Sequence, residues 1–153
     1  MFRRTISILK SPEYERSYDF LEFSEKVPLY SPPPTYPLPD LAEQLTLLEH
    51  EIFTSLPLSQ CFDQKWNQSN AMELAPGIIS YTSRFNKMTY MVATEIVLAP
   101  SLSQRVAIIK RYIVVAKKCY SMNNFNTSME IICGLNTASV QKLKTAWKVE
   151  KFQ

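Results

Sequence analysis

The sequence predicts an all-α protein, and three features lead to this prediction. Of the 153 residues, 46% are apolar and 20% are charged, a composition typical of a globular protein. The chain has only two glycines and few runs in which apolar and polar residues alternate, as they do in half-buried strands. After residue 40, apolar residues recur at spacings of three and four, the period of one helix face. We therefore expect amphipathic helices packed around one core.

The first 39 residues differ from the rest, and we expect them to form a poorly ordered arm that ends in a proline-rich linker. Residues 1–27 show no sustained period, and residues 27–40 contain six prolines. The fixed φ and missing N–H of proline favour an extended spacer. The spacing of Pro34 and Pro37 also suits an SH3 ligand, but no basic residue flanks it closely, so a plain linker is favoured. The predicted globular domain spans residues 40–153.

The first predicted helix begins at Asp40, because Asp40 and Glu43 have the spacing of a helix cap and Pro39 should block helix further back. On it, Glu49 and Glu51 are expected to be solvated, and His50, the only histidine, to be an edge residue. Pro57 should end the helix, and a short helix over residues 58–63 should follow. The predicted buried face consists of Leu41, Leu45, Leu48, Ile52 and Leu56.

Two long helices are predicted next, separated at Pro100. The first should start near Pro76, since proline is tolerated in a first helical turn. Its predicted apolar stripe is Ile78, Thr82, Phe85, Thr89, Val92 and Ile96. The stripe of the second is Leu102, Val106, Ile109, Ile113, Ala116 and Tyr120.

Residues 123–147 predict two further helices joined at a tight corner. The first carries the apolar residues Met129, Ile131, Ile132 and Leu135, and Gly134 falls where its pattern ends. Asn136 should cap the next helix, whose face would contain Val140, Leu143 and Trp147. Asn136 would then stand at the corner, where it could face a partner.

The sequence lacks the motifs of most catalytic sites. Neither glycine lies in a phosphate-binding loop, so we expect no direct nucleotide binding, and no cofactor is implied. The single histidine leaves no catalytic triad, and no Cys/His spacing suits a metal. The three cysteines are widely spaced, as expected of reduced thiols, and each is interpreted as a small buried hydrophobe. The residues therefore favour a protein that acts by binding.

Charge is distributed unevenly along the chain. Residues 1–100 contain eight Lys/Arg against twelve Asp/Glu, whereas residues 101–153 contain nine against two. The basic half could face an acidic protein, an acidic membrane surface or nucleic acid, or it could be an ordinary solvated helix surface. Few aromatic residues interleave with the lysines, which disfavours nucleic acid. No apolar run reaches the length of about 18 residues that spans a bilayer.

Several segments, in order, resemble the catalytic domain of Ras-family guanine nucleotide exchange factors, the RasGEF domain. The segments are AEQLTLLEHEIF at 42–53, Cys61 with Trp66, RFN at 84–86, VATEI at 92–96, QRVAIIKRYI at 104–113, NNFN at 123–126, GLN at 134–136 and KLKTAW at 142–147. By the family pattern this is about the first half of the domain. We therefore expect a multi-helix RasGEF-like fold that stops before the helical hairpin that displaces switch 1 of the GTPase.

The resemblance implies a cytoplasmic protein, recruited to membranes through its partner, that promotes GDP release from a Ras-family small GTPase without covalent chemistry. It also implies that Met129, Asn136, Gln141 and Arg84 contact the GTPase. The NNFN asparagines are expected to be mainly structural, and Gln44 and Asn86 match other recurrent polar positions. Many relatives have arginine before RFN where this chain has Ser83, and this leaves the choice among Ras, Rap and Ral open.

Three alternatives to an active exchange factor remain open at this point. The chain could be a binding module that holds a GTPase without driving exchange, or a regulatory decoy of that kind. It could be a fragment that needs the missing half to fold, because a half-domain would expose apolar surface. Nucleic-acid binding through the basic half is the least favoured.

Overall fold

The computed structural model describes residues 38–151, and side chains over residues 41–149. The described part contains helices and no strand, which confirms the all-α prediction. The helices are α3 (Leu38–Thr54), η2 (Leu58–Cys61), η3 (Lys65–Asn67), α4 (Ala71–Leu74), α5 (Pro76–Leu98), α6 (Leu102–Ser121), α7 (Phe125–Leu135), α8 (Ala138–Gln141) and α9 (Lys144–Lys151). Residues 1–37 of the predicted arm and linker lie outside the described residues, and the last residues of the predicted extended spacer, from Leu38, are instead the first turn of α3.

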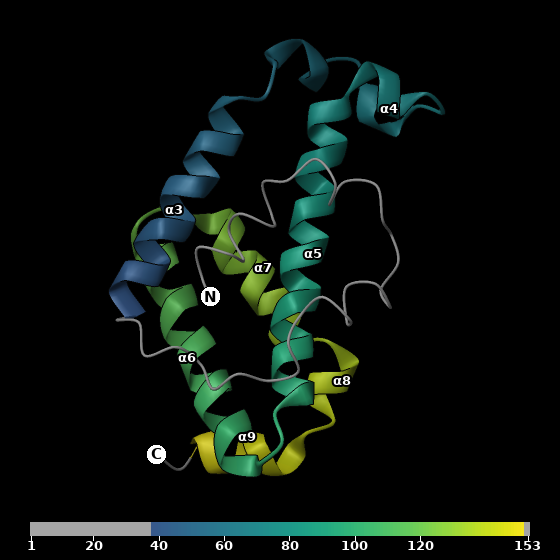
Figure 1. The fold of residues 1–153 in the computed structure, drawn as a ribbon. Coiled ribbons are helices and arrows are strands. Elements are labelled where there is room, and N and C mark those ends of the chain that lie inside the picture. The colour runs from purple at the N-terminus through teal and green to yellow at the C-terminus, as the bar shows by residue number, and fades with distance from the viewer. Residues whose placement is uncertain (1–37, 152–153) are drawn as a thin grey trace.

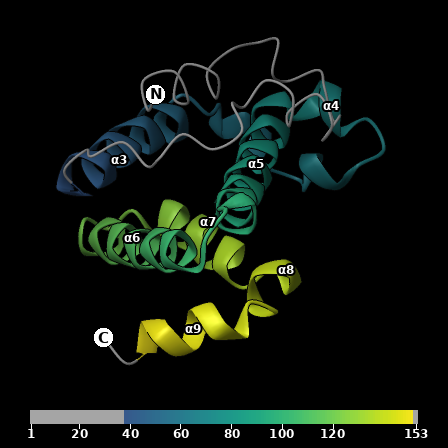
Figure 2. The ribbon, with the colours of Figure 1, turned by 60° about the horizontal axis from the view of Figure 1, so that its bottom comes forward.

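The long helices α3, α5 and α6 run up and down the molecule, with α7 packed between them (Figure 1). Helices α3 and α5 extend past α6 and α7 at one end, where η2, η3 and α4 connect them. Helices α8 and α9 cross the opposite end, below α6 in the view of Figure 2. No helix among the described residues is long and apolar enough to cross a bilayer.

Helix α3 begins two residues before the predicted start at Asp40, so the predicted cap is wrong. Pro39 lies in the first turn, where the N–H that proline lacks has no intrahelical acceptor, and it therefore does not block the helix. The predicted core residues Leu41, Leu45 and Leu48 are buried. Helix α6 begins with a capping box formed by Ser101 and Gln104.

The buried face of α5 is rotated from the predicted stripe. Thr82 is exposed, and the face instead contains Arg84, Met88, Val92, Ala93 and Ile96. The interior accepts Arg84 because carboxylates from α3 and α7 surround it. On α6, Leu102 and Tyr120 are exposed, while Ile108, Tyr112, Val115 and Cys119 complete the buried face.

The corner between α7 and α8 differs from the prediction in two ways. Asn136 is the C-cap of α7, and Thr137, not Asn136, precedes α8. Gly134 lies inside α7 with its backbone against α5, where an added Cβ would meet Thr89 O and Val92 Cβ, each at 2.7 Å. The glycine therefore allows close helix packing and does not end the helix.

Candidate functional site

Helix α7 has two apolar faces, one buried and one exposed. Ile131 and Leu135 face the core, whereas Phe125, Met129 and Ile132 are 56%, 53% and 42% exposed. Together with the exposed Asn136, these three residues follow one another at intervals of four, three and four, so they share one side of the helix. We call Phe125, Met129, Ile132 and Asn136 the α7 ridge. Exposed apolar side chains in a row on one side of a helix make this ridge a candidate surface for binding another protein.

The start of α7 is held by the NNFN segment. Asn124 Oδ1 accepts a hydrogen bond from Thr127 N at 3.1 Å, which caps the helix, and Asn124 Nδ2 donates to Thr46 Oγ1 on α3 at 3.1 Å. Asn123 adopts a left-handed conformation with φ of 61°, which asparagine tolerates better than most residues. The structural role expected for these asparagines is confirmed.

The middle of α7 is held by a buried polar cluster of five residues from three helices. Arg84 Nη1 on α5 lies 2.7 Å from Glu49 Oε2 on α3 and 2.8 Å from Glu130 Oε1 on α7. Asn126 Nδ2 donates to Glu49 Oε1 at 2.7 Å and to Glu130 Oε1 at 3.2 Å, and the Tyr81 hydroxyl donates to Glu49 Oε1. The expectation that Glu49 is solvated is therefore wrong. Its carboxylate lies inside because Arg84 is there to pair with it.

One guanidinium faces two carboxyl groups in this cluster, and one of them, Glu130, has a raised pKa. Burial raises the pKa of Glu130 to about 8; Arg84 opposes this shift and Glu49 adds to it. Below that pH, a neutral Glu130 leaves Arg84 and Glu49 as a balanced buried ion pair. Burial and the hydrogen bond to Glu49 raise the pKa of Tyr81, so it remains a donor.

The structure brings three of the four predicted site residues to one surface. Gln141 Nε2 donates to Leu135 O at 3.0 Å and to Asn136 Oδ1 at 3.4 Å, so Gln141 and Asn136 adjoin, and Met129 lies on the same side of α7 as Asn136. Arg84 is separate: it is buried, with its side chain turned to carboxylates. Direct contact between Arg84 and a partner stays a prediction, and the described conformation presents little of its side chain.

Sequence reasoning missed Phe125 and Ile132 as surface residues and Glu130 as a buried one. Two signals could have identified them. An 11-residue helix with apolar residues on two faces has more apolar surface than one core contact needs. Glu130 is also one of only two acids in residues 101–153, and it stands between Met129 and Ile131.

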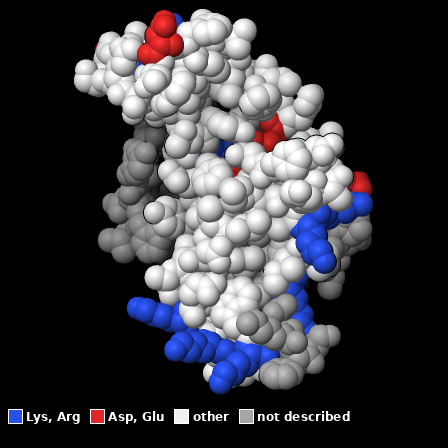
Figure 3. Space-filling view, turned by 180° about the vertical axis from the view of Figure 1, so that it is seen from behind, with Lys and Arg blue, Asp and Glu red and all other residues white. Residues whose placement is uncertain are grey.

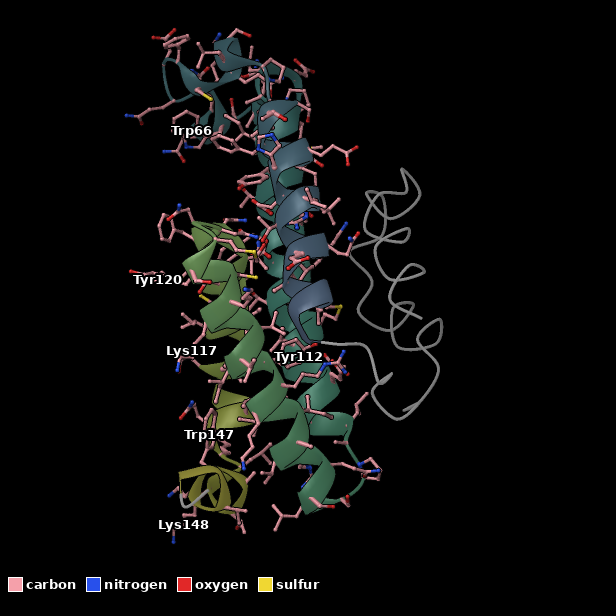
Figure 4. All side chains as sticks on the ribbon, turned by 90° about the vertical axis from the view of Figure 1, so that its left-hand side faces the viewer. Trp66, Tyr112, Lys117, Tyr120, Trp147 and Lys148 are labelled. Atoms are coloured by element: carbon pink, nitrogen blue, oxygen red, sulfur yellow. The ribbon has the colours of Figure 1, made fainter. Side chains whose placement is uncertain are left out.

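Cations lie beside the ridge rather than within it. Tyr120 contacts Phe125 edge to face, with ring centroids 5.3 Å apart, and so extends the ridge onto α6. Figure 3, which views the molecule from behind, shows wide areas without charged residues and Lys and Arg mainly over the lower half, toward the end formed by α8 and α9. In Figure 4, Lys117, Tyr120, Trp147 and Lys148 project to the same side.

The described residues offer no other obvious chemistry. They contain no group of three or more potential metal ligands. Cys119 is buried as expected, and burial raises the pKa of its thiol to about 11, but Cys61 is exposed, so the buried interpretation is wrong for it. His50 is exposed, as predicted for an edge residue.

Comparison with known proteins shows the family of this chain. The family model of the RasGEF domain matches residues 40–152. The chain belongs to the RasGEF family. Relatives in this family include the Ras guanine nucleotide exchange factors E and M of Dictyostelium discoideum, 44% identical over 109 residues and 37% identical over 148 residues. The Ras-specific guanine nucleotide-releasing factor 1 of Mus musculus is 35% identical over 117 residues.

These RasGEF relatives are much longer than the matched region. The alignments cover 71%, 96% and 76% of this chain but only 10%, 14% and 9% of factor E, factor M and the mouse factor, respectively. The chain therefore spans a small part of the length of each relative.

Proposed function

We propose that this chain binds a Ras-family small GTPase through the α7 ridge and acts in guanine nucleotide exchange. The observation that carries the proposal is the ridge itself: three exposed apolar side chains and Asn136 on a helix fixed from behind by buried polar contacts. Membership of the RasGEF family supports a GTPase as the partner. A cytoplasmic location, with recruitment to membranes through the GTPase, belongs to the same proposal.

Exchange by such a protein requires no covalent step. A protein that binds the nucleotide-free GTPase more tightly than the GDP-bound form shifts the population toward the free form. Each tenfold difference in affinity between the two forms corresponds to about 1.4 kcal/mol. The ridge would supply contact with the GTPase, and its preference for one nucleotide state would determine how much release it promotes.

The experiment that tests this function compares nucleotide states. The 1–153 polypeptide would be measured by biolayer interferometry against Ras, Rap and Ral proteins, each loaded with GDP or stripped of nucleotide. We expect at least one GTPase to bind, and its nucleotide-free form to bind at least tenfold more tightly. Equal affinity for the two forms would contradict the exchange role and support the alternative of a non-catalytic GTPase-binding module. Failure to bind any of the three would contradict both.

Substitutions on the ridge should weaken this binding more than substitutions elsewhere. We expect Met129→Ala to lower the affinity about tenfold, and Asn136→Ala several-fold, because an interface polar group left unpaired costs about 1–3 kcal/mol. Helix content by circular dichroism should not change. The matched control is Met72→Ala on α4, since Met72 is also an exposed helical methionine, at 70% against 53% for Met129.

A charge-based interface would give the opposite ranking. Charge reversal at Lys142 and Lys144, both exposed beside the corner, should affect binding less than Asn136→Ala does. If the lysine substitutions proved more damaging at physiological salt, electrostatic attraction would be the main contribution and the ridge would not be the principal contact.

A further inference from the structure

Glu130 is the residue after Met129 on α7, yet its carboxyl group points into the protein. It is fully buried, and its Oε1 accepts from Arg84 at 2.8 Å and from Asn126 at 3.2 Å. Its backbone oxygen also accepts from Thr89 Oγ1 on α5 at 3.2 Å. Both the side chain and the main chain of this one residue are therefore fixed to α5.

We propose that Glu130 is a positioning residue: through Arg84 and Asn126 it sets the rotation and height of α7, and so determines how Met129 and Asn136 are presented to a GTPase. This proposal rests on the proposed function, because it takes the α7 ridge to be the surface that binds a GTPase. It goes further in assigning a role in binding to a side chain that does not reach the surface.

The geometry supports positioning because the ridge and the cluster share one short helix. Successive residues of an α-helix point about 100° apart, so a rotation that moves Glu130 away from Arg84 moves Met129 by the same angle. The contact at Gly134 fixes the end of α7 against α5, and Asn124 fixes its start against α3. Between these two ends, the side-chain anchors are Glu130, bonded to Arg84 on α5, and Asn126, bonded to Glu49 on α3.

The charge of Glu130 gives this anchor a measurable signature. The groups that face it are Glu49 from α3, Arg84 and Tyr81 from α5, and the Cys119 thiol from α6. Loss of the Glu130 proton would place two carboxylates against one guanidinium in the interior. Repulsion between them would then push α7 away from its position, and the ridge would move with it. Tyr81 and Cys119 stay protonated at that pH, because the pKa of Tyr81 is raised and that of Cys119 is raised to about 11.

The first test monitors the environment of the Met129 side chain in the absence of any GTPase. In the 1–153 chain labelled with ¹³C at methionine methyl groups, we expect the Met129 signal, assigned by its loss in Met129→Leu, to titrate with a midpoint near pH 8. The Met72 signal should not follow it. Glu130→Gln, which keeps an acceptor but cannot ionise, should abolish the titration. A Met129 signal that does not titrate, or that titrates unchanged in Glu130→Gln, would overturn the proposal.

The second test measures GTPase binding, and it distinguishes failure of this proposal from failure of the proposed function. Binding is measured to whichever nucleotide-free GTPase binds the parent chain. At pH 7, the affinity of Glu130→Gln should lie within about twofold of the parent's. At pH 9 the parent should bind several-fold more weakly than at pH 7, and Glu130→Gln should not show this weakening. Glu130→Ala should weaken binding about tenfold at equal folded fraction. Val106→Ala, a core substitution on α6 near α9, should lower the melting temperature without changing affinity. Unchanged affinity in Glu130→Ala would overturn positioning. If no GTPase binds the parent, the proposed function fails, and the methyl titration still decides whether Glu130 positions α7.

Discussion

Arg84→Ala is expected to destabilise the fold by about 3–5 kcal/mol, because it leaves Glu49 as a buried carboxylate without its counter-ion. The cost is specific to the cluster, because Arg84 pairs with both Glu49 and Glu130. Denaturation by urea, followed by circular dichroism at pH 7, would measure the change. Lys142→Ala, which alters an exposed cation, should change stability by less than about 0.5 kcal/mol.

A triple substitution would show that charge is the cause. Arg84→Met combined with Glu49→Gln and Glu130→Gln removes every ionisable member of the ion pairs while nearly keeping volume, and it should recover a large part of the lost stability. If Arg84→Ala alone cost less than about 1 kcal/mol, the two carboxyl groups would have to reach water, and the buried cluster would not hold α7 as described.

Gly134→Ala is expected to destabilise the protein by about 1–3 kcal/mol or more, since the new methyl group would overlap the backbone of α5. The added Cβ would lie 2.7 Å from Thr89 O, and a backbone oxygen in a helix cannot rotate aside. The helices α5 and α7 would have to separate, although alanine by itself favours helix by about 1 kcal/mol over glycine. Thermal unfolding would measure the loss.

The other glycine provides the matched control. Gly77 also lies in a helix, and a Cβ there would meet Gln60 Oε1 at 2.9 Å. Gln60 is a flexible side chain that can shift, at the cost of the hydrogen bond that its Oε1 accepts from Gly77 N at 2.8 Å. Gly77→Ala should therefore cost less than Gly134→Ala. Equal costs at the two positions would mean that loss of backbone freedom, and not contact between α5 and α7, decides the effect of Gly134→Ala.

Local pattern was sufficient for much of the fold and failed where distant parts of the chain meet. Proline at position 76 and the apolar period of α3 predicted those elements, because both signals act within a few residues. The burial of Arg84 depends on Glu49 and Glu130, which lie 35 and 46 residues away in the sequence. The spacing of apolar residues within one helix cannot reveal a pairing between residues so far apart. An arginine on a helix is normally found at the surface, and a stripe chosen by apolar spacing alone does not include Arg84.

The corner residues show the same limit. Gly134 resembles a helix-ending signal when read alone, and only its contact with α5 reveals that it permits close packing. Met129 and Ile132 are apolar like their buried neighbours, so composition does not distinguish the exposed side of α7 from the core side. The resemblance to exchange factors identified Met129 and Asn136 as candidates and gave Arg84 and the NNFN asparagines a role, but it did not indicate the exposure of Phe125 and Ile132 or the pairing of Arg84 with Glu49 and Glu130.

The anchoring of α7 at its start, middle and end has a consequence for the rates of binding. Because the chain fixes this helix when it folds, a partner does not have to order it on arrival, and the entropic cost of association is correspondingly smaller. The free and bound forms should share one backbone conformation at α7, as in most rigid interfaces. Substitutions on the exposed side should then leave the association rate nearly constant and act by shortening the lifetime of the complex.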